Sequence, residues 1–441
     1  MNKILVLGAG RSATSLIDYL IQHAEVNHWQ LTVADADLAL ANAKTKNNPV
    51  AKAIRFSLED TIHLISLIKN HDVVVSLMPA QLHQPIAEIC LSERKHLFTA
   101  SYVSPAMQQL HEKVKQADLL FMNECGLDPG IDHMTAMELM DDIKSEGGKI
   151  ISFESFTGGL IAPETDPDNP WRYKFTWNPR NVVMAGLGTA KFLEDNQLKY
   201  VPHQQLFTRT TKVKVEGIGL LDGYPNRDSL QYKSIYGLDD VSTMIRGTLR
   251  FEGYCQAWNV LVQLGVCDES FEIENLNMLS PETFMQAYLP AGEGSAQEKI
   301  TKLFPKQSEG VRLLEWSGFF KTQKFKTEKA TPAKVVEWIL QDKWQLQPND
   351  KDLIVMWHRL KYKLNNTEKV IEASLVVKGE NAEKTAMADT VGLPLAIAVS
   401  LLMQNKIKAR GVVIPIDKSI YQPILHELKS LGIEMKTKTI A

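Results

Sequence analysis

The chain has 441 residues, more than one hydrophobic core usually holds, so two or three domains are expected. Apolar residues make up 44% and charged residues 23%, as in globular proteins, and a net charge of -3 leaves no basic excess for binding nucleic acid. The longest later apolar run, residues 391–403, is shorter than the roughly 20 residues of a membrane-spanning helix. Four widely spaced cysteines without a CxxC pair fit a reducing compartment. We therefore expect a cytoplasmic protein with neither a nucleic-acid nor a membrane partner.

Short β-rich runs alternate with helical stretches from residue 3 to about residue 125. The runs "KILVLG" and "DVVVS" are typical of buried strands, and "SATSLIDYLIQHA" and "QPIAEICLSER" are typical of the helices that connect them. Strands joined by helical crossovers form a parallel sheet covered on both faces. This α/β pattern predicts a variant Rossmann domain that binds a dinucleotide.

The pattern changes after residue 126. Residues 149–160 and 211–220 are predicted strands, and the long aromatic and proline-rich passage that follows the first of them is interpreted as a functional loop. Helical patterns prevail from about residue 251 to 345, and two later strands that meet at Asn365 and Asn366 predict a hairpin. The expected domains are a dinucleotide-binding domain over 1–125 completed by 390–441, a mixed α/β substrate domain over 126–260 and 350–390, and a small helical domain over 261–349.

Residues 8–13, "GAGRSA", match the pattern G-x-G-x-x-A between a predicted strand and a predicted helix. Gly8 permits a tight turn, Gly10 lets the backbone approach a pyrophosphate, and Ala13 lets the helix pack close to the strand. A six-residue match is also compatible with a glycine turn that binds nothing. Asp35 closes the next apolar run, where a ribose-binding carboxylate belongs, and this context favours a dinucleotide site.

Asp35 also bears on the choice of cofactor. A carboxylate at this position accepts a hydrogen bond from the ribose 2′-hydroxyl group of NAD but repels the 2′-phosphate of NADP. No lysine or arginine lies between Asp35 and Lys44 in the sequence to offset that charge. NAD(P) is therefore the predicted cofactor, and NAD is favoured over NADP.

Three arginines in the second half of the chain suggest a site for a carboxylated small molecule. Arg227 lies in "YPNRDS", and Arg246 and Arg250 lie in "IRGTLRFEG". Arginine binds carboxylates through paired hydrogen bonds, but the same spacing also fits a solvated face with ordinary salt bridges. The chain lacks the P-loop, Y-x-x-x-K and H-E-x-x-H motifs, and no metal site is predicted.

Eight motifs in the same order resemble the saccharopine reductase family, the L-glutamate-forming saccharopine dehydrogenases. They are "GAGRSA", "SLMPAQLH", "TASYVSPAM", "NECGLDPGIDH", "GGLIAPETDPDNPWRYKFTWNPRNV", "YPNRDS", "IRGTLRFEG" and "TVGLPLAIA". The resemblance implies a variant Rossmann domain, an α/β domain that binds saccharopine and mediates dimer contacts, and a small helical domain. It also implies an oxidoreductase of lysine metabolism that acts on CH-NH donors. The implied reaction is reversible hydride transfer between NAD(P) and the secondary amine of saccharopine, giving glutamate and 2-aminoadipate 6-semialdehyde.

The resemblance implies roles for individual residues. Asp128 and Tyr102 become the candidates for proton transfer and orientation, and Asp128 is expected to stay ionised beside the ammonium group of the substrate. The expected cofactor contacts are Gly8, Ala9, Gly10, Arg11, Ser12, Asp35, Ala36, Asp37, Ser57, Leu58, Ser76, Leu127, Asp128, Pro129 and Trp177. The expected substrate contacts are Ser101, Tyr102, Asp128, Arg227, Thr248, Leu249 and Arg250.

Two positions depart from the family pattern. The fungal members carry an arginine for the NADP phosphate just after the second strand, where this chain has "ADAD". A cysteine usual before the paired glycines is Thr157 here, which excludes an essential thiol at that position.

The alternatives to a saccharopine dehydrogenase are a carboxynorspermidine or lysine dehydrogenase of the same superfamily and, from a different class, a noncatalytic NAD-binding regulatory module. The resemblance also implies a homodimer.

Residues 123–133, "NECGLDPGIDH", carry several groups that suit a metal site, an acid/base pair or a reactive thiol. Asp132 and His133 are adjacent, and nothing nearby completes a tetrahedral ligand set. Pro129 fixes its φ angle and Gly130 permits an unusual one, so the turn can hold Asp128 rigidly at the carboxyl edge of the sheet. Asp132 and His133 are therefore expected to be structural, and Cys125 is expected to pack in the core.

Overall fold

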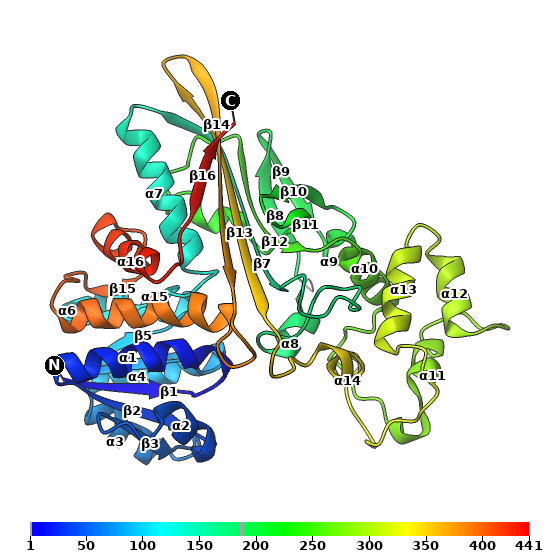
Figure 1. Cartoon of the computed structure of the whole chain (residues 1–441), viewed down its shortest axis with the longest axis horizontal. Helices are drawn as coiled ribbons and strands as arrows, with labels where there is room; N and C mark the ends of the chain where they lie inside the picture. Colours follow the sequence, from blue (N-terminus) through cyan, green and yellow to red (C-terminus); the bar gives the residue numbers. More distant parts are fainter. Residues whose placement is uncertain (1, 186–187, 441) are drawn as a thin grey trace. The chain divides into compact units, whose positions relative to one another are not determined.

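The computed structural model describes residues 2–185 and 188–440, and these residues form two units. The first unit comprises the chain up to Glu146 together with Leu375–Met435. The second unit comprises Gly147–Ser374 together with the residues from Lys436 onward. Each unit is built on one sheet (Figure 1).

The first unit contains a seven-stranded parallel sheet in the order β15-β6-β5-β4-β1-β2-β3. The strand β4 is buried along its whole length, as expected where helices cover both faces. The order reverses at β1, which pairs with β2 on one side and β4 on the other, and ligands of such sheets gather at the carboxyl ends beside this point. The strands are β1 (Lys3–Leu7), β2 (Gln30–Asp35), β3 (Ala51–Arg55), β4 (Val73–Ser76), β5 (His96–Phe98), β6 (Leu120–Met122) and β15 (Gly411–Val413).

Helices connect these strands and confirm the predicted variant Rossmann architecture. The strand β3 is missing from the predicted elements because it lies at the sheet edge and its residues are only half-buried or exposed, so it has no continuous apolar run. The helices of this unit are α1 (Thr14–Asn27), α2 (Leu38–Thr45), α3 (Thr61–Lys69), α4 (His83–Ser92), α5 (Pro105–Gln109), α6 (His111–Gln116), α7 (Ile131–Ser145), α15 (Ala386–Met403) and α16 (Lys418–Ser430), with the short 3-10 helices η1 (Arg11–Ala13) and η2 (Ala80–Leu82).

The helix α15 is long and apolar enough to cross a membrane, judged by length and composition alone. However, 83% of it is buried inside the protein, and it packs against α1. A Cβ atom on Gly392 would lie 3.0 Å from the backbone nitrogen of Leu16, so glycine permits the two helices to approach closely. The helix therefore serves as a core element of the first unit.

The second unit contains a nine-stranded mixed sheet whose main order is β10-β11-β12-β7-β13-β14-β16, with β8 pairing to β12 and β9 to β8. The long strands β13 and β14 form the predicted hairpin, in which Asn365 and Asn366 have left-handed φ angles of 50° and 64°. The strands are β7 (Lys149–Ile161), β8 (Ala190–Glu194), β9 (Gln197–Val201), β10 (Thr211–Val215), β11 (Gly219–Pro225), β12 (Thr243–Arg250), β13 (Asp352–Leu364), β14 (Thr367–Lys378) and β16 (Lys436–Thr439).

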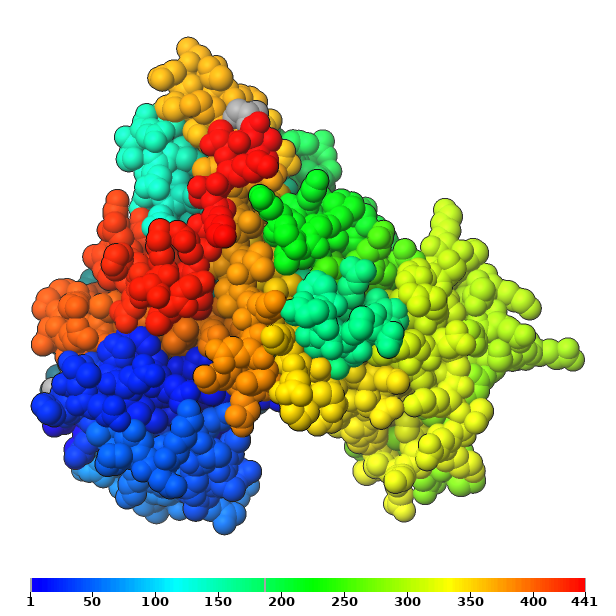
Figure 2. Space-filling view, viewed as in Figure 1, coloured from blue at the N-terminus to red at the C-terminus, as the bar shows by residue number. Residues whose placement is uncertain are grey.

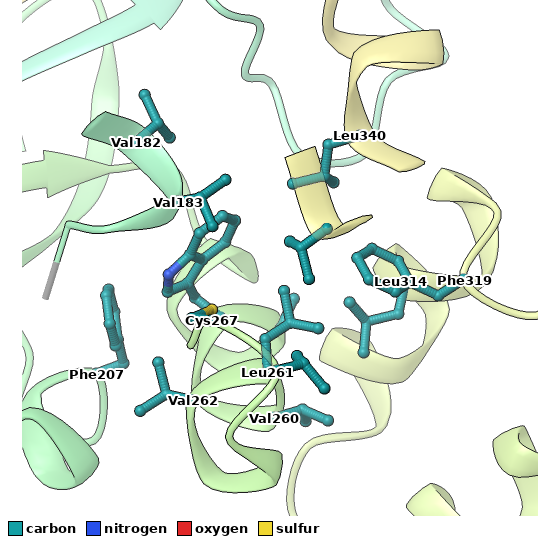
Figure 3. Close-up of a cluster of buried hydrophobic side chains, with 14 of the residues drawn as sticks. Val182, Val183, Phe207, Val260, Leu261, Val262, Cys267, Leu314, Phe319 and Leu340 are labelled. Carbon is teal, nitrogen blue, oxygen red and sulfur yellow. The ribbon is translucent and has the colours of Figure 1, made fainter. Parts of the chain in front are cut away.

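The helical segment predicted as a separate domain over 261–349 shares one hydrophobic core with the rest of the second unit. Figure 3 shows Val182 and Phe207 in the same cluster as Leu261, Leu314 and Leu340. In Figure 2 the segment from α11 to α14 forms a lobe coloured yellow-green to yellow. The helices are α8 (Pro179–Val183), α9 (His203–Leu206), α10 (Tyr254–Leu264), α11 (Pro281–Gln286), α12 (Ala296–Leu303), α13 (Ser308–Ser317) and α14 (Pro332–Trp344), with the 3-10 helices η3 (Ser229–Tyr232) and η4 (Leu276–Met278).

Other observed boundaries also differ from the predicted ones. The helix α7 groups with the first unit rather than with the substrate domain, because it packs against α16. Residues 211–220 form a hairpin instead of one strand, since β10 turns into β11 at Gly217 and Gly219, whose φ angles are 77° and 102°. The last residues add the strand β16 to the second sheet, where it pairs with β14.

Candidate active site

The glycine-rich loop follows β1 and leads through η1 into α1. Gly8 has a φ angle of 101° and donates its backbone N–H to the carbonyl of Ala34, 2.8 Å away. A Cβ atom on Gly10 would meet nothing within 4 Å, so this side of the loop is open. The cap residues of η1 and α1 are Gly10 and Ala13, which make no side-chain capping hydrogen bond; Arg11 is exposed and Ser12 half-buried. The open backbone at a helix start fits a bound pyrophosphate.

Asp35 ends β2 and holds the glycine loop in place. Its Oδ2 accepts from the backbone N–H of Ala9 at 2.7 Å, and its Oδ1 accepts from that of Asp37 at 2.9 Å. Asp37 caps α2 by accepting from the N–H groups of Ala39 and Leu40, and Ala36 between the two aspartates is exposed. Asp35 is therefore a structural acceptor in addition to any contact with a ribose.

Strand register places a cation beside Asp35 that distance along the sequence conceals. Arg55 is the last residue of β3 and is paired with Asp35 in the parallel sheet. Arg55 is exposed. Ser57 and Leu58 follow shortly after it, exposed and half-buried respectively. Arg55 is therefore a basic residue near Asp35 in the folded chain, which a count of residues adjacent in sequence does not include.

A buried histidine joins two of the predicted ligand contacts. Ser76 is the last residue of β4 and is fully buried, and Ser101 follows β5. The side chain of His83, the first residue of α4, lies within hydrogen-bond distance of both hydroxyl groups. His83 was not predicted as a site residue, and its only signal in the sequence is its place at the end of "SLMPAQLH".

Asp128 and Tyr102 lie together in the first unit. The Tyr102 hydroxyl group donates to Oδ1 of Asp128 at 3.3 Å, and both residues are half-buried. The loop under Asp128 is closed by hydrogen bonds between backbone groups, from Gly126 N–H to the Pro129 carbonyl at 3.0 Å and from Ile131 N–H to the Gly126 carbonyl at 2.8 Å. Leu127 and Pro129 are buried in this loop. The sequence motif therefore forms a tight loop that presents one carboxylate.

Gly130 is expected to be the least replaceable residue of this loop. Its φ angle is 149°, and a Cβ atom would lie 2.0 Å from the carbonyl oxygen of Gly126. We expect Gly130→Ala to lower the free energy of unfolding by about 4 kcal/mol or more, measured by urea denaturation. Gly147→Ala is the matched control, because Gly147 has a φ angle of 84° with open space around it. Its cost should be about 1–2 kcal/mol, and equal losses in the two variants would contradict this account of the loop.

The other polar groups of the motif have internal partners. His133 is fully buried, and its Nε2 lies 2.8 Å from Oε2 of Glu124, while Oε1 of Glu124 accepts from the backbone N–H of Val103. Asp132 accepts from the N–H of Gly130 at 2.6 Å. Cys125 is buried with its Sγ 3.6 Å from the carbonyl of Pro394. Within residues 2–185 and 188–440, no group of three or more His, Cys, Asp or Glu residues is placed to hold a metal ion.

Arg250 is the most deeply buried cation among the predicted substrate contacts. It is 5% exposed, and its guanidinium carbon lies 5.0 Å from the ring centroids of both Tyr173 and Tyr254. Its Nη1 donates to the carbonyl of Leu249 at 2.8 Å, whereas its Nε has no hydrogen-bond partner in the described part of the chain. A buried guanidinium with a spare donor is suited to a carboxylate, because charge-assisted pairs offset the cost of burial.

The remaining predicted residues of the second unit occupy different surroundings. Arg227 is exposed with a φ angle of 51°, and the neighbouring Asn226 donates to Oγ1 of Thr248 at 3.3 Å. The side chain of Leu249 is fully buried in the hydrophobic core, and its backbone lies in β12 between β11 and β7, where its carbonyl accepts from Arg250. Trp177 is 36% exposed and ends a passage whose other aromatic residues are buried.

Comparison with known proteins divides the chain near residue 125. Residues 4–122 match the saccharopine dehydrogenase NADP binding domain, and residues 126–433 match the saccharopine dehydrogenase C-terminal domain. This chain belongs to the saccharopine dehydrogenase family. The match confirms the resemblance inferred from the eight sequence motifs.

Individual members of the saccharopine dehydrogenase family extend this result. The chain is 33% identical to saccharopine dehydrogenase [NADP(+), L-glutamate-forming] of Saccharomyces cerevisiae, over 99% of both chains. It is 31% identical to the alpha-aminoadipic semialdehyde synthase of Arabidopsis thaliana, over 99% of this chain but only 44% of that longer protein. The solved apo structure of the L-Glu forming saccharopine dehydrogenase from Saccharomyces cerevisiae superposes with a TM-score of 0.88, at 31% identity and with both chains fully covered.

Proposed function

We propose that this chain is an L-glutamate-forming saccharopine dehydrogenase. The substrate is a secondary amine that bears several carboxylates, and the observation that carries the proposal is the buried Arg250, which has a spare hydrogen-bond donor. Full-length similarity to the yeast enzyme supports the same substrate. Reduction of NAD(P) by saccharopine, followed at the nicotinamide absorbance band, tests the proposal.

The reaction assigns distinct tasks to the protein. Saccharopine, NAD(P)+ and water give glutamate, 2-aminoadipate 6-semialdehyde, NAD(P)H and a proton. Because the aldehyde is at carbon 6 of the aminoadipate half, the hydride leaves that carbon for the bound cofactor, and water then cleaves the resulting carbon–nitrogen double bond. The chain must therefore hold the carboxylates, orient the amine and manage the protons.

Asp128, Tyr102 and Arg250 carry these tasks in our proposal. The Asp128 carboxylate pairs with the ammonium group of saccharopine, and Tyr102 orients that carboxylate through the hydrogen bond to its Oδ1. Arg250 binds a carboxylate of the substrate through its spare donor, assisted by Arg227 and Thr248. The first unit supplies the cofactor contacts through its glycine loop, Asp35, Ser76 and the Asp128 loop.

The cofactor is NAD(P), and we propose that NAD is preferred over NADP. Asp35 and Asp37 place two carboxylates at the carboxyl end of β2, where the 2′-phosphate of NADP would be repelled. Two facts weigh on the other side: the printed name of the yeast relative specifies NADP(+), and Arg55 pairs with Asp35 in the sheet. The preference therefore depends on the balance between these carboxylates and Arg55.

Ala36→Arg is expected to shift the preference toward NADP. Ala36 is exposed between the two aspartates, so the substitution adds a cation without removing the hydrogen bonds of Asp35 to the glycine loop. We expect the ratio of kcat/KM for NADP to that for NAD to rise by about tenfold or more, as one charge-assisted hydrogen bond is worth about 1.5–3 kcal/mol. Ala36→Gln, similar in length but neutral, is the control.

Two results would remove the argument for NAD. One is an Ala36→Arg variant whose NADP to NAD ratio equals that of the wild type. The other is a wild type that already prefers NADP and loses this preference in Arg55→Gln, which would make Arg55 the phosphate contact.

The alternatives differ in substrate or in class. A carboxynorspermidine or lysine dehydrogenase would use the same redox chemistry on another amine. A noncatalytic NAD-binding regulatory module would need only the first unit, whereas the buried Arg250 lies in the second. A test of which of these amines reduces NAD(P), or whether none does, separates the proposals.

We also propose that the enzyme is a cytoplasmic homodimer. All four cysteines are free and buried, and burial raises the pKa of the Cys267 thiol to about 12, so that thiol stays protonated. Such thiols suit a reducing compartment. Light scattering of the purified protein should report twice the mass of one chain, and a monomeric mass would rule out the dimer.

A further inference from the structure

His83 connects the carboxyl ends of two neighbouring strands, β4 and β5. Its Nδ1 lies 3.0 Å from Oγ of Ser76, which ends β4. Its Nε2 lies 2.8 Å from Oγ of Ser101 and 3.2 Å from Oγ1 of Thr99, both of which follow β5. The residue is 5% exposed, so these hydroxyl groups account for the surroundings of both ring nitrogens. The imidazole thus bridges a predicted cofactor contact and a predicted substrate contact.

The environment keeps the imidazole neutral. Burial lowers the pKa of His83 to about 4, and its hydrogen-bond partners are hydroxyl groups rather than carboxylates. A neutral imidazole donates from one nitrogen and accepts at the other. It can therefore order two hydroxyl groups in a fixed direction without carrying charge.

The proposed contact between Ser101 and the substrate decides which ring nitrogen of His83 carries the hydrogen. Ser101 is also fixed through its backbone N–H, which donates to Oγ1 of Thr99 at 3.2 Å. If Nε2–H donates to Oγ of Ser101, the hydroxyl proton of Ser101 is left to bind an anionic ligand, and Nδ1 accepts from the hydroxyl group of Ser76. In the opposite tautomer Nε2 accepts from its nearer hydroxyl partner, Ser101 at 2.8 Å rather than Thr99 at 3.2 Å, which uses the Ser101 proton internally and leaves an oxygen lone pair facing a carboxylate. Only the first arrangement suits a carboxylated substrate.

We propose that His83 is a positioning residue for the saccharopine reaction, and that its Nε2–H tautomer orients Ser101 to donate a hydrogen bond to a substrate carboxylate. This inference rests on the proposed function, because the substrate defines what Ser101 contacts. It assigns no proton transfer to His83, whose role is to set the direction of two hydroxyl groups.

Three variants test this role: His83→Ala, His83→Gln and, as a matched control, His96→Gln. His96 is also a buried histidine of the first unit with a pKa lowered by burial to about 4. It starts β5, whereas Ser101 follows the end of that strand, and its Nδ1 accepts from the backbone N–H of Leu120. Glutamine keeps one donor and one acceptor, so it replaces the neutral imidazole with the least chemical change.

We expect His83→Ala to lower kcat/KM for saccharopine by about 10- to 100-fold, chiefly through KM, because the variant loses the directed hydrogen bond from Ser101 to the substrate carboxylate. His83→Gln should recover activity to within about threefold of the wild type, and His96→Gln should match the wild type. Ser101→Ala should cause a similar loss, and the double variant His83→Ala/Ser101→Ala should lose little more than either single variant, since the two residues act as one unit. The far-UV circular dichroism spectrum and the thermal midpoint of each variant report that it is folded.

Several results would overturn the inference. Unchanged kcat/KM in a folded His83→Ala variant, or fully additive losses in the double variant, would show that His83 does not act through Ser101. Loss in His83→Gln of an ionisation between pH 6 and 8 from the pH profile of kcat would make the imidazole a proton carrier instead. A wild type that binds NADH but does not oxidise saccharopine would overturn the proposed function and this inference together.

Discussion

Arg250→Met is expected to lower kcat/KM for saccharopine by about a hundredfold while leaving the thermal midpoint unchanged or higher. The loss follows because the spare donor of Arg250 makes one charge-assisted hydrogen bond to a carboxylate, which is worth about 1.5–3 kcal/mol. The stability follows from burial, since replacing a buried cation that has no carboxylate partner in the described part of the chain with an apolar side chain of similar length removes a desolvation cost. Steady-state kinetics and differential scanning calorimetry on the same samples measure the two effects.

The controls separate charge from geometry at Arg250. Arg250→Lys keeps the charge but loses the planar fork, so its kcat/KM should fall between those of the wild type and Arg250→Met. Arg312→Met removes an exposed arginine that pairs with Glu309 at 2.6 Å, and its activity should match the wild type. A large drop in the thermal midpoint of Arg250→Met would instead make Arg250 a structural residue held by the rings of Tyr173 and Tyr254.

Asp128→Asn is expected to lower kcat/KM for saccharopine by about a hundredfold. The amide is isosteric with the carboxylate but carries no charge, so it loses the charge-assisted bond to the substrate ammonium group, worth about 1.5–3 kcal/mol. Tyr102→Phe should cost about fivefold, because it removes only the neutral hydrogen bond that orients Asp128. Initial-rate measurements at saturating cofactor give both values.

An exposed carboxylate on α7 provides the matched control for this charge change. Asp142→Asn removes one negative charge from the surface of the same unit and should leave kcat/KM within about twofold of the wild type. If Asp128→Ala and Tyr102→Phe both kept the turnover and substrate affinity of the wild type, neither residue would belong to the substrate site.

The parts of the fold and site that could be predicted rest on local patterns. Gly8, Gly10 and Asp35 lie at fixed places around one strand–loop–helix unit, and the structure has this unit where the sequence predicts it. The loop at Asp128 is equally local, since Gly130 closes onto Gly126 only four residues away. Short-range geometry of this kind is encoded by glycine, proline and the residues between them.

The features that the sequence patterns missed depend on contacts between distant segments. Arg55 is paired with Asp35 only through the register of β2 and β3, and the role of His83 depends on Ser101, which follows β5. The helical segment from 261 to 349 has amphipathic helices of its own, but whether they close a separate core depends on packing with residues such as Val182 and Phe207. Periodicity shows that a helix has an apolar face and does not show which element covers it.

The comparison of three amines as substrates tests the central claim most directly. Purified protein with NAD or NADP is mixed with saccharopine, lysine or carboxynorspermidine, the nicotinamide absorbance is followed, and the products are identified by mass spectrometry. We predict reduction with saccharopine only, with glutamate and 2-aminoadipate 6-semialdehyde as the products. Reduction with lysine or carboxynorspermidine in place of saccharopine, or no reduction with any of the three, would contradict this assignment.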